Sequence, residues 1–294
     1  MKKFLIFIGK ILLLLLLSAF VLDFIYTYVY KNATPQNKVQ FIHSLKNRKF
    51  NYIFIGSSRV ENSIISEQIE KQTKKTVLNL GMKGLRLKDM SYVVKLLHKN
   101  KVSFDTIFVQ LDYSYNDEEG YSKFFFHELL PFSNSSDSSI ENYLESTNNK
   151  YLYYKYIPFL KYIDSDALVG FRKVVASFKN NVSVFEFNKG YVPLYGTSYI
   201  NKENIPEHLA HKNKYFEEID FFRINNNHRV IYFSAPVTLS TDNLDYFIKL
   251  KSVVPQLYNF HNVISNESYF YDNYHLNHDG AIIFTNILID RLNL

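Results

Sequence analysis

Residues 53–59 of the chain have the sequence IFIGSSR. Its apolar half predicts a buried parallel strand, its Gly-Ser-Ser half a tight turn, and the pattern after it a helix. In open α/β sheets, ligands bind at such a junction, at the carboxyl end of a strand. Ser58 would lie there at a helix N-terminus, whose backbone N–H groups suit the oxyanion that a nucleophilic serine creates. The logic is that of a nucleophile elbow, although the G-x-S-x-G pattern is absent.

The same stretch has two other interpretations. Ser58 and Glu61 fit the capping box S-x-x-E, in which the serine caps the helix and needs no chemistry. In the third interpretation the turn is a phosphate cradle, with Arg59 as its cation.

Strands and helices alternate along most of the chain after residue 50. Apolar runs predict strands at 52–55, 76–80, 106–111, 229–233 and 262–265. Helical spacing predicts helices after the first strand and at about 88–99, 207–225, 244–258 and 278–292. This alternation predicts a three-layer α/β/α fold with a parallel sheet covered on both faces.

Residues 113–204 lack this rhythm, and we interpret them as an insertion beside the active edge of the sheet. They contain a polar loop at 133–139 and a cluster of tyrosines. Aromatic side chains can stack on sugar rings, but clusters at helical spacing more often belong to a core. The cluster comprises Tyr151, Tyr153, Tyr154, Tyr156 and Tyr162.

Residues 4–26 are apolar except for Lys10 and Asp23, and the segment is long enough to cross a bilayer. No A-x-A cleavage pattern surrounds Ser18-Ala19, so we favour an uncleaved anchor over a signal peptide. Lysines flank the segment on both sides, and the positive-inside rule does not decide its orientation. We therefore expect an anchor at 1–30, a linker at 31–49 and one α/β domain at 50–294.

Composition limits the kinds of partner and cofactor that we expect for this chain. The chain has 294 residues with 47% hydrophobic content, no cysteine and a net charge of +6. Its basic residues are scattered and form no stripe suited to nucleic acid. The chain uses no disulfides, and we expect no metal, no cofactor and no nucleic-acid partner.

A second informative stretch is FYDNYHLN, residues 270–277, just before the last predicted helix. Asn277 is a natural N-cap for that helix. His275 and Asp272 have the types and spacing of a general base and the carboxylate that orients it. Taken alone, a histidine of this kind is more often structural.

The order Ser58, then Asp272-x-x-His275 before the final helix, resembles the SGNH (GDSL-like) hydrolase superfamily over residues 51–112 and 229–294. The resemblance implies a flavodoxin-like sheet, with Ser58 as nucleophile, His275 as base and Asp272 as orienting acid. Ser57 stands where the family commonly has aspartate.

The resemblance also implies an oxyanion hole made by three donors. These are Ser58 itself, Gly81 from the Asn-Leu-Gly block after the second strand, and Asn116 from residues 114–117. Asn116 fits the third block of the family only if the match is shifted along the chain. In the usual register after the third strand, Asp112 stands at that position.

The anchor and the Gly-Ser-Ser block are similar to those of cell-envelope acylation proteins of the DltD and alginate O-acetylation type. That similarity implies an extracytoplasmic serine esterase or O-acyltransferase, which acts on O-acyl groups of an envelope polysaccharide through an acyl-serine. Its partners would be the bilayer, the polymer or acyl donor, and a membrane-bound O-acyltransferase. The alternative is a non-catalytic subunit that keeps the sheet and the anchor and binds the polymer or that acyltransferase.

Overall fold

The computed structural model describes residues 1–133, 138–179, 188–198, 205–225 and 229–294. The chain forms two compact units. One combines Met1–Phe41 with Lys123–Ser183, and the other combines Ile42–Ser122 with Val184–Leu294. The predicted anchor and the middle of the predicted insertion thus belong to one unit. This division differs from the expected one at 1–30, 31–49 and 50–294, because the N-terminal helix contacts the inserted helices.

The second unit, here called the sheet unit, is built on five parallel strands in the order β2-β1-β3-β4-β5. Ile55 of β1 is in register with Val109 of β3, so these strands end together at one edge. The predicted α/β fold with a parallel sheet is confirmed. The strands are β1 Lys49–Ile55, β2 Val77–Asn79, β3 Ser103–Gln110, β4 Arg229–Ser234 and β5 Leu257–Asn259.

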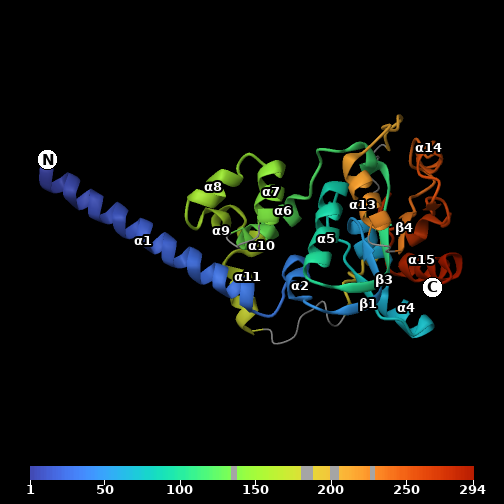
Figure 1. The fold of residues 1–294 in the computed structure, drawn as a ribbon, viewed down its shortest axis with the longest axis horizontal. Coiled ribbons are helices and arrows are strands. Elements are labelled where there is room, and N and C mark those ends of the chain that lie inside the picture. Colours follow the sequence, from blue (N-terminus) through green and yellow to red (C-terminus); the bar gives the residue numbers. More distant parts are fainter. Residues whose placement is uncertain (134–137, 180–187, 199–204, 226–228) are drawn as a thin grey trace. The chain divides into compact units, whose positions relative to one another are not determined.

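Helices cover both faces of this sheet, with α5 on one side and α4 and α15 on the other (Figure 1). α15 packs against α3 and α4, and α13 packs against α5. Phe54 and Phe108 stack in the core beneath α15, with ring centroids 4.4 Å apart. The helices are α3 Ser58–Ser63, α4 Ser66–Thr73, α5 Leu87–Lys99, α13 Lys214–Asn225, α14 Asp245–Val253 and α15 His278–Leu292.

Three predicted elements have different bounds, each for a local reason. The helix after β1 is split into α3 and α4, because Ile64 and Ile65 are extended. α13 starts at residue 214 rather than 207, where Asn213 Oδ1 accepts the N–H groups of the first helical residues. The fifth strand predicted at 262–265 is wrong: α14 ends before Pro255, which lacks an N–H, and β5 follows at 257–259.

The first unit, here called the helical unit, contains α1 Lys2–Asn32 and the helices of the insertion. α1 is long and apolar enough to cross a membrane. The described part of the chain buries none of its most apolar 18-residue stretch. A short α2, Lys38–Ser44, follows it. The inserted helices are α6 Lys123–Leu129, η2 Leu130–Phe132, α7 Ser138–Thr147, α8 Tyr151–Tyr156, α9 Leu160–Asp164, α10 Asp166–Val169 and α11 Phe171–Lys179.

The tyrosine cluster divides between core and surface. Tyr151, Tyr154 and Tyr162 are buried, as the helical spacing predicts, whereas Tyr153 and Tyr156 are exposed. Most of the polar loop predicted at 133–139, residues 134–137, lies outside the described residues.

Candidate active site

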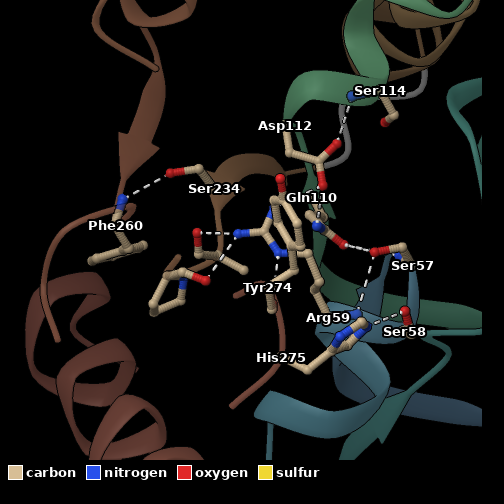
Figure 2. Close-up of polar contacts among 12 residues, drawn as sticks. Ser57, Ser58, Arg59, Gln110, Asp112, Ser114, Ser234, Phe260, Tyr274 and His275 are labelled. Atoms are coloured by element: carbon tan, nitrogen blue, oxygen red, sulfur yellow. Dashed lines mark hydrogen bonds and ion pairs between the residues drawn. The ribbon is translucent and has the colours of Figure 1, made fainter. Parts of the chain in front are cut away.

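Ser58 is the first residue of α3, which follows β1 after Gly56 and Ser57. The residue that caps α3 is Ser57, whose Oγ accepts the N–H of Arg59 at 3.3 Å. The capping interpretation of Ser58 is therefore wrong by one residue, because the extended Ser57 stands at the cap position. The Ser58 hydroxyl is instead 2.7 Å from His275 Nε2 (Figure 2).

His275 is oriented by Asp272, as the Asp-x-x-His spacing predicts. The Nδ1 atom of His275 lies 2.8 and 2.9 Å from the two carboxylate oxygens. A proton on Nδ1 satisfies this carboxylate and leaves Nε2 as the acceptor for the Ser58 hydroxyl. The structure thus brings together the three residues that the sequence predicts as nucleophile, base and orienting acid.

Asp272 also builds the turn that carries the histidine. Its Oδ1 accepts the backbone N–H groups of Tyr274 and His275, both at 2.9 Å. Burial acts to raise the pKa of Asp272, but the hydrogen bond and charge of His275 and the two N–H groups outweigh it, so the net pKa is lowered. The carboxylate therefore stays ionised beside the imidazole.

The turn passes directly into the last helix. Asn277 caps α15, with its Oδ1 accepting the N–H of Gly280 at 3.0 Å. The predicted cap and the predicted bounds of this helix are confirmed. His275 is consequently held two residues from a fixed helix end.

Arg59, proposed above as a phosphate ligand, is 1% exposed and already engaged. Its Nη1 lies 3.0 Å from Asp112 Oδ2, and its Nε donates to the Tyr274 carbonyl at 3.2 Å. Its Nη2 donates to the carbonyl oxygens of Ala235 and Pro236 at 2.5 and 3.0 Å. The phosphate interpretation is wrong, because the guanidinium is enclosed by protein acceptors. It joins the ends of β3 and β4 to the histidine turn.

Gln110 extends this network to the cap residue. Its Oε1 accepts the N–H and the hydroxyl of Ser57 at 2.8 and 3.0 Å. Its Nε2 donates to Asp112 Oδ2 at 2.6 Å. Figure 2 shows the resulting chain of polar contacts from Ser57 through Gln110 and Asp112 to Arg59. It fixes the backbone on both sides of Ser58.

Gly81, expected to donate to an oxyanion, lies against the first turns of α3. Its N–H donates to Asn79 Oδ1 at 2.9 Å, and a Cβ added to it would lie 2.3 Å from the Glu61 nitrogen. The Asn79 amide donates in turn to the carbonyl oxygens of Val60 and Ile64. In this arrangement the Asn-Leu-Gly block holds the helix that carries Ser58.

Asn116, the other expected oxyanion donor, has its side chain engaged elsewhere. Its Nδ2 donates to the His208 carbonyl, and its Oδ1 accepts the N–H of Ala210 and the hydroxyl of Tyr246. These contacts tie the turn after β3 to residues 208–210. Two of the three expected oxyanion donors, the Gly81 N–H and the Asn116 side chain, therefore have partners within the protein.

Sequence reasoning did not identify the role of residues 189–194. Val192 donates its N–H to the Glu61 carbonyl at 3.0 Å, and Leu194 accepts the N–H of His278 at 2.7 Å. The segment therefore links α3 to α15, the helix next to the histidine. Gly190, with φ +91°, supplies the turn that starts it. The available sequence signal was Gly190-Tyr191-Val192-Pro193, whose glycine and proline mark a turn.

Comparisons with known proteins add little to this geometry. No family model matches the chain, and no curated protein matches it. One solved structure, described as that of "a putative platelet activating factor from Streptococcus pneumonia", shares 13% identity over 97% of this chain and 98% of its own, with a TM-score of 0.36. A similarity this low supports no conclusion about this chain, so the site is interpreted from its own geometry.

Proposed function

We propose that this chain is a membrane-anchored serine hydrolase or acyltransferase of the SGNH type, acting on ester bonds. The observation that carries the proposal is the hydrogen-bonded series Ser58 Oγ, His275 Nε2, His275 Nδ1 and the Asp272 carboxylate. A nucleophile within hydrogen-bond reach of a base, itself oriented by a third group, is the arrangement that nucleophilic catalysis needs.

In the proposed reaction, His275 Nε2 takes the proton of Ser58 as Oγ attacks the carbonyl carbon of the ester. The tetrahedral intermediate collapses, its bond to the alkoxide breaks, and His275 returns the proton to that leaving group. Water or a sugar hydroxyl then attacks the acyl-serine as His275 takes its proton. The bond between the acyl carbon and Oγ breaks, the acyl product leaves, and His275 returns the proton to Ser58 Oγ. Asp272 stabilises the imidazolium formed in each half of the cycle.

We propose an O-acyl group on a cell-envelope polysaccharide as the substrate, with the sheet unit outside the cytoplasm and a membrane-bound O-acyltransferase as partner. The apolar length of α1 supports the anchoring, and the resemblance noted from the sequence supports the substrate class. Protease added to intact spheroplasts should then digest the sheet unit, and protection until lysis would reverse the topology.

A non-catalytic subunit is the second candidate. The engagement of the Gly81 N–H and the Asn116 side chain within the protein favours it, because an oxyanion donor contributes about 3 kcal/mol of transition-state stabilisation in hydrolases. Such a subunit would keep the fold and the anchor and bind the polymer or the acyltransferase.

Adjacent serines provide the test that separates these candidates. The wild-type protein should react with a fluorophosphonate probe and hydrolyse p-nitrophenyl acetate. Ser58→Ala should lose both activities and keep its melting temperature. Ser57→Ala should keep measurable labelling but lose about 1 kcal/mol of stability, because Ser57 caps the helix. Labelling of Ser58→Ala at the wild-type level would exclude Ser58 as the nucleophile. No labelling of a folded wild-type protein would support the non-catalytic subunit.

A further inference from the structure

Asp23 is an acidic residue inside the long apolar helix α1, and the helical unit neutralises it. Lys161 Nζ lies 2.9 Å from both carboxylate oxygens of Asp23, and the Phe159 N–H donates to it at 2.8 Å. Nearby, the Thr27 and Tyr162 hydroxyls are 2.7 Å apart. The turn between α8 and α9 is therefore fixed to α1 at the level of Asp23.

This attachment sets the depth of the turn along α1. Residues 4–22, which precede Asp23, rise about 28 Å at about 1.5 Å per residue, close to the hydrocarbon thickness of about 30 Å. With these residues across a bilayer, Asp23 and Lys161 lie at the boundary with the headgroups. The turn at 156–159 lies at that same boundary.

The surface of the turn is apolar. Tyr156 and Ile157 are 71% and 47% exposed, and Ile163 on the adjoining helix is 64% exposed. On α1, Phe20 and Phe24 are also exposed. An aromatic and aliphatic surface of this kind, continuous with an apolar helix, suits the interface of a membrane.

A groove of about 370 Å³ separates α1 from this turn. Among the described residues, the charged side chains that line it are those of Lys31, Lys155, Lys161 and Asp23. Lys155 is also paired with Glu141 at 3.3 Å and Glu145 at 3.7 Å, and Lys161 is paired with Asp23 at 2.9 Å. Basic side chains beside apolar ones complement phospholipid, whose phosphate lies just outside its acyl chains.

We propose that the α8–α9 turn, here residues 156–159, docks into the phospholipid interface beside α1, with the lysine side chains of the groove near the lipid phosphates. The occupant is lipid rather than a protein partner, because the surface lies at the depth where the apolar part of α1 ends. The proposal rests on the proposed membrane anchoring of α1.

The chain contains no tryptophan, so single tryptophans can report depth. Leu15→Trp, Ile157→Trp and Phe124→Trp would be prepared in the full-length protein and placed in phosphatidylcholine–phosphatidylglycerol nanodiscs. Leu15 reports the anchor and Ile157 the turn. Phe124 is the matched control, because its helix α6 is bonded to Tyr30, seven residues or about 10 Å beyond Asp23 along α1.

Lipids brominated near the headgroup end of the chain should quench Ile157→Trp about twofold, since interfacial groups lie about 5–10 Å into the headgroup–acyl boundary. Lipids brominated near the chain end should quench Leu15→Trp most strongly. Phe124→Trp should be quenched weakly and should remain open to aqueous acrylamide.

Each outcome separates docking from anchoring. Quenching of Leu15→Trp without quenching of Ile157→Trp overturns the docking and leaves the anchor. No quenching of either overturns the anchor and the docking with it. Equal quenching of Ile157→Trp and Phe124→Trp overturns the depth assignment. An Ile157→Trp probe shielded from acrylamide but unquenched by brominated lipid would overturn the lipid contact and show that the turn is covered by protein in the nanodisc.

Discussion

Arg59 Nη1 lies 3.0 Å from Asp112 Oδ2, in an ion pair whose side chains are 1% and 5% exposed. The same guanidinium donates to the Tyr274 carbonyl, in the residue before His275. Arg59 is also the neighbour of Ser58 in sequence. It is therefore a positioning residue that connects the backbone of the proposed nucleophile to that of its base.

Two variants should distinguish the effect of Arg59 on stability from its effect on turnover. Arg59→Met should lose about 3–5 kcal/mol, because it leaves the Asp112 carboxylate buried without its cation. Arg59→Met combined with Asp112→Asn should recover much of that stability, since no lone charge remains. The double variant should nevertheless stay slow in ester hydrolysis, because Tyr274 is no longer held. Recovery of turnover together with stability would assign Arg59 a purely structural role.

The proposed triad should behave as a unit. Ser58→Ala and His275→Ala should each reduce esterase kcat by about 10⁴-fold or more, and the double variant should lose little further. Asp272→Asn should cost less, because the base remains but its tautomer is no longer fixed. The measurement is kcat on one activated ester for all four variants. Independent, multiplicative losses would contradict a shared mechanism.

The lowered pKa of Asp272 predicts a pH window for stability. A carboxyl group whose pKa is lower in the folded state stabilises the protein above its unfolded pKa of about 3.9. That contribution is lost as the pH falls through the lower, folded pKa. Urea unfolding of wild type and Asp272→Asn should therefore differ most near pH 5 and converge in more acidic solution. A difference that grows on acidification would reverse the sign.

Two glycines with positive φ form a matched pair. A Cβ at Gly190 (φ +91°) would lie 1.8 Å from the Asn79 carbonyl oxygen, whereas nothing lies within 4 Å of one at Gly196 (φ +73°). Gly196→Ala should cost about 1–2 kcal/mol from backbone strain alone. Gly190→Ala should cost about 3 kcal/mol or more, because it also collides with the end of β2. Equal losses of unfolding free energy in the two variants, measured by urea unfolding, would exclude a cost from the collision at Gly190.

Local sequence patterns predicted the parts of this protein that depend on local physics. The run before Gly56 gave a strand because its apolar residues are buried on both faces of a parallel sheet. Asn277 caps α15 because an asparagine side chain can accept an N–H within its own turn. His275 and Asp272 are three residues apart, so their contact also forms within one turn.

Local sequence patterns could not predict contacts between segments that are far apart in the chain. Arg59 next to a turn has the same local sequence whether it faces a phosphate or is enclosed by Asp112 and the end of β4. Asn116 shows the same limit, because residues 208–210 decide where its amide points. The attachment of the inserted helices to α1 depends on the contact between Asp23 and Lys161, which are 138 positions apart.

The hydrogen bond between Ser58 and His275 joins residues 217 positions apart, and this separation has a consequence during synthesis. A ribosome that adds about 5–20 residues per second needs about 10–40 s to reach His275 after Ser58. β4, which flanks β3 in the sheet, is also made late. α1 therefore leaves the ribosome long before the proposed nucleophile meets its proposed base, and a chain whose translation stops before residue 275 carries Ser58 without that partner.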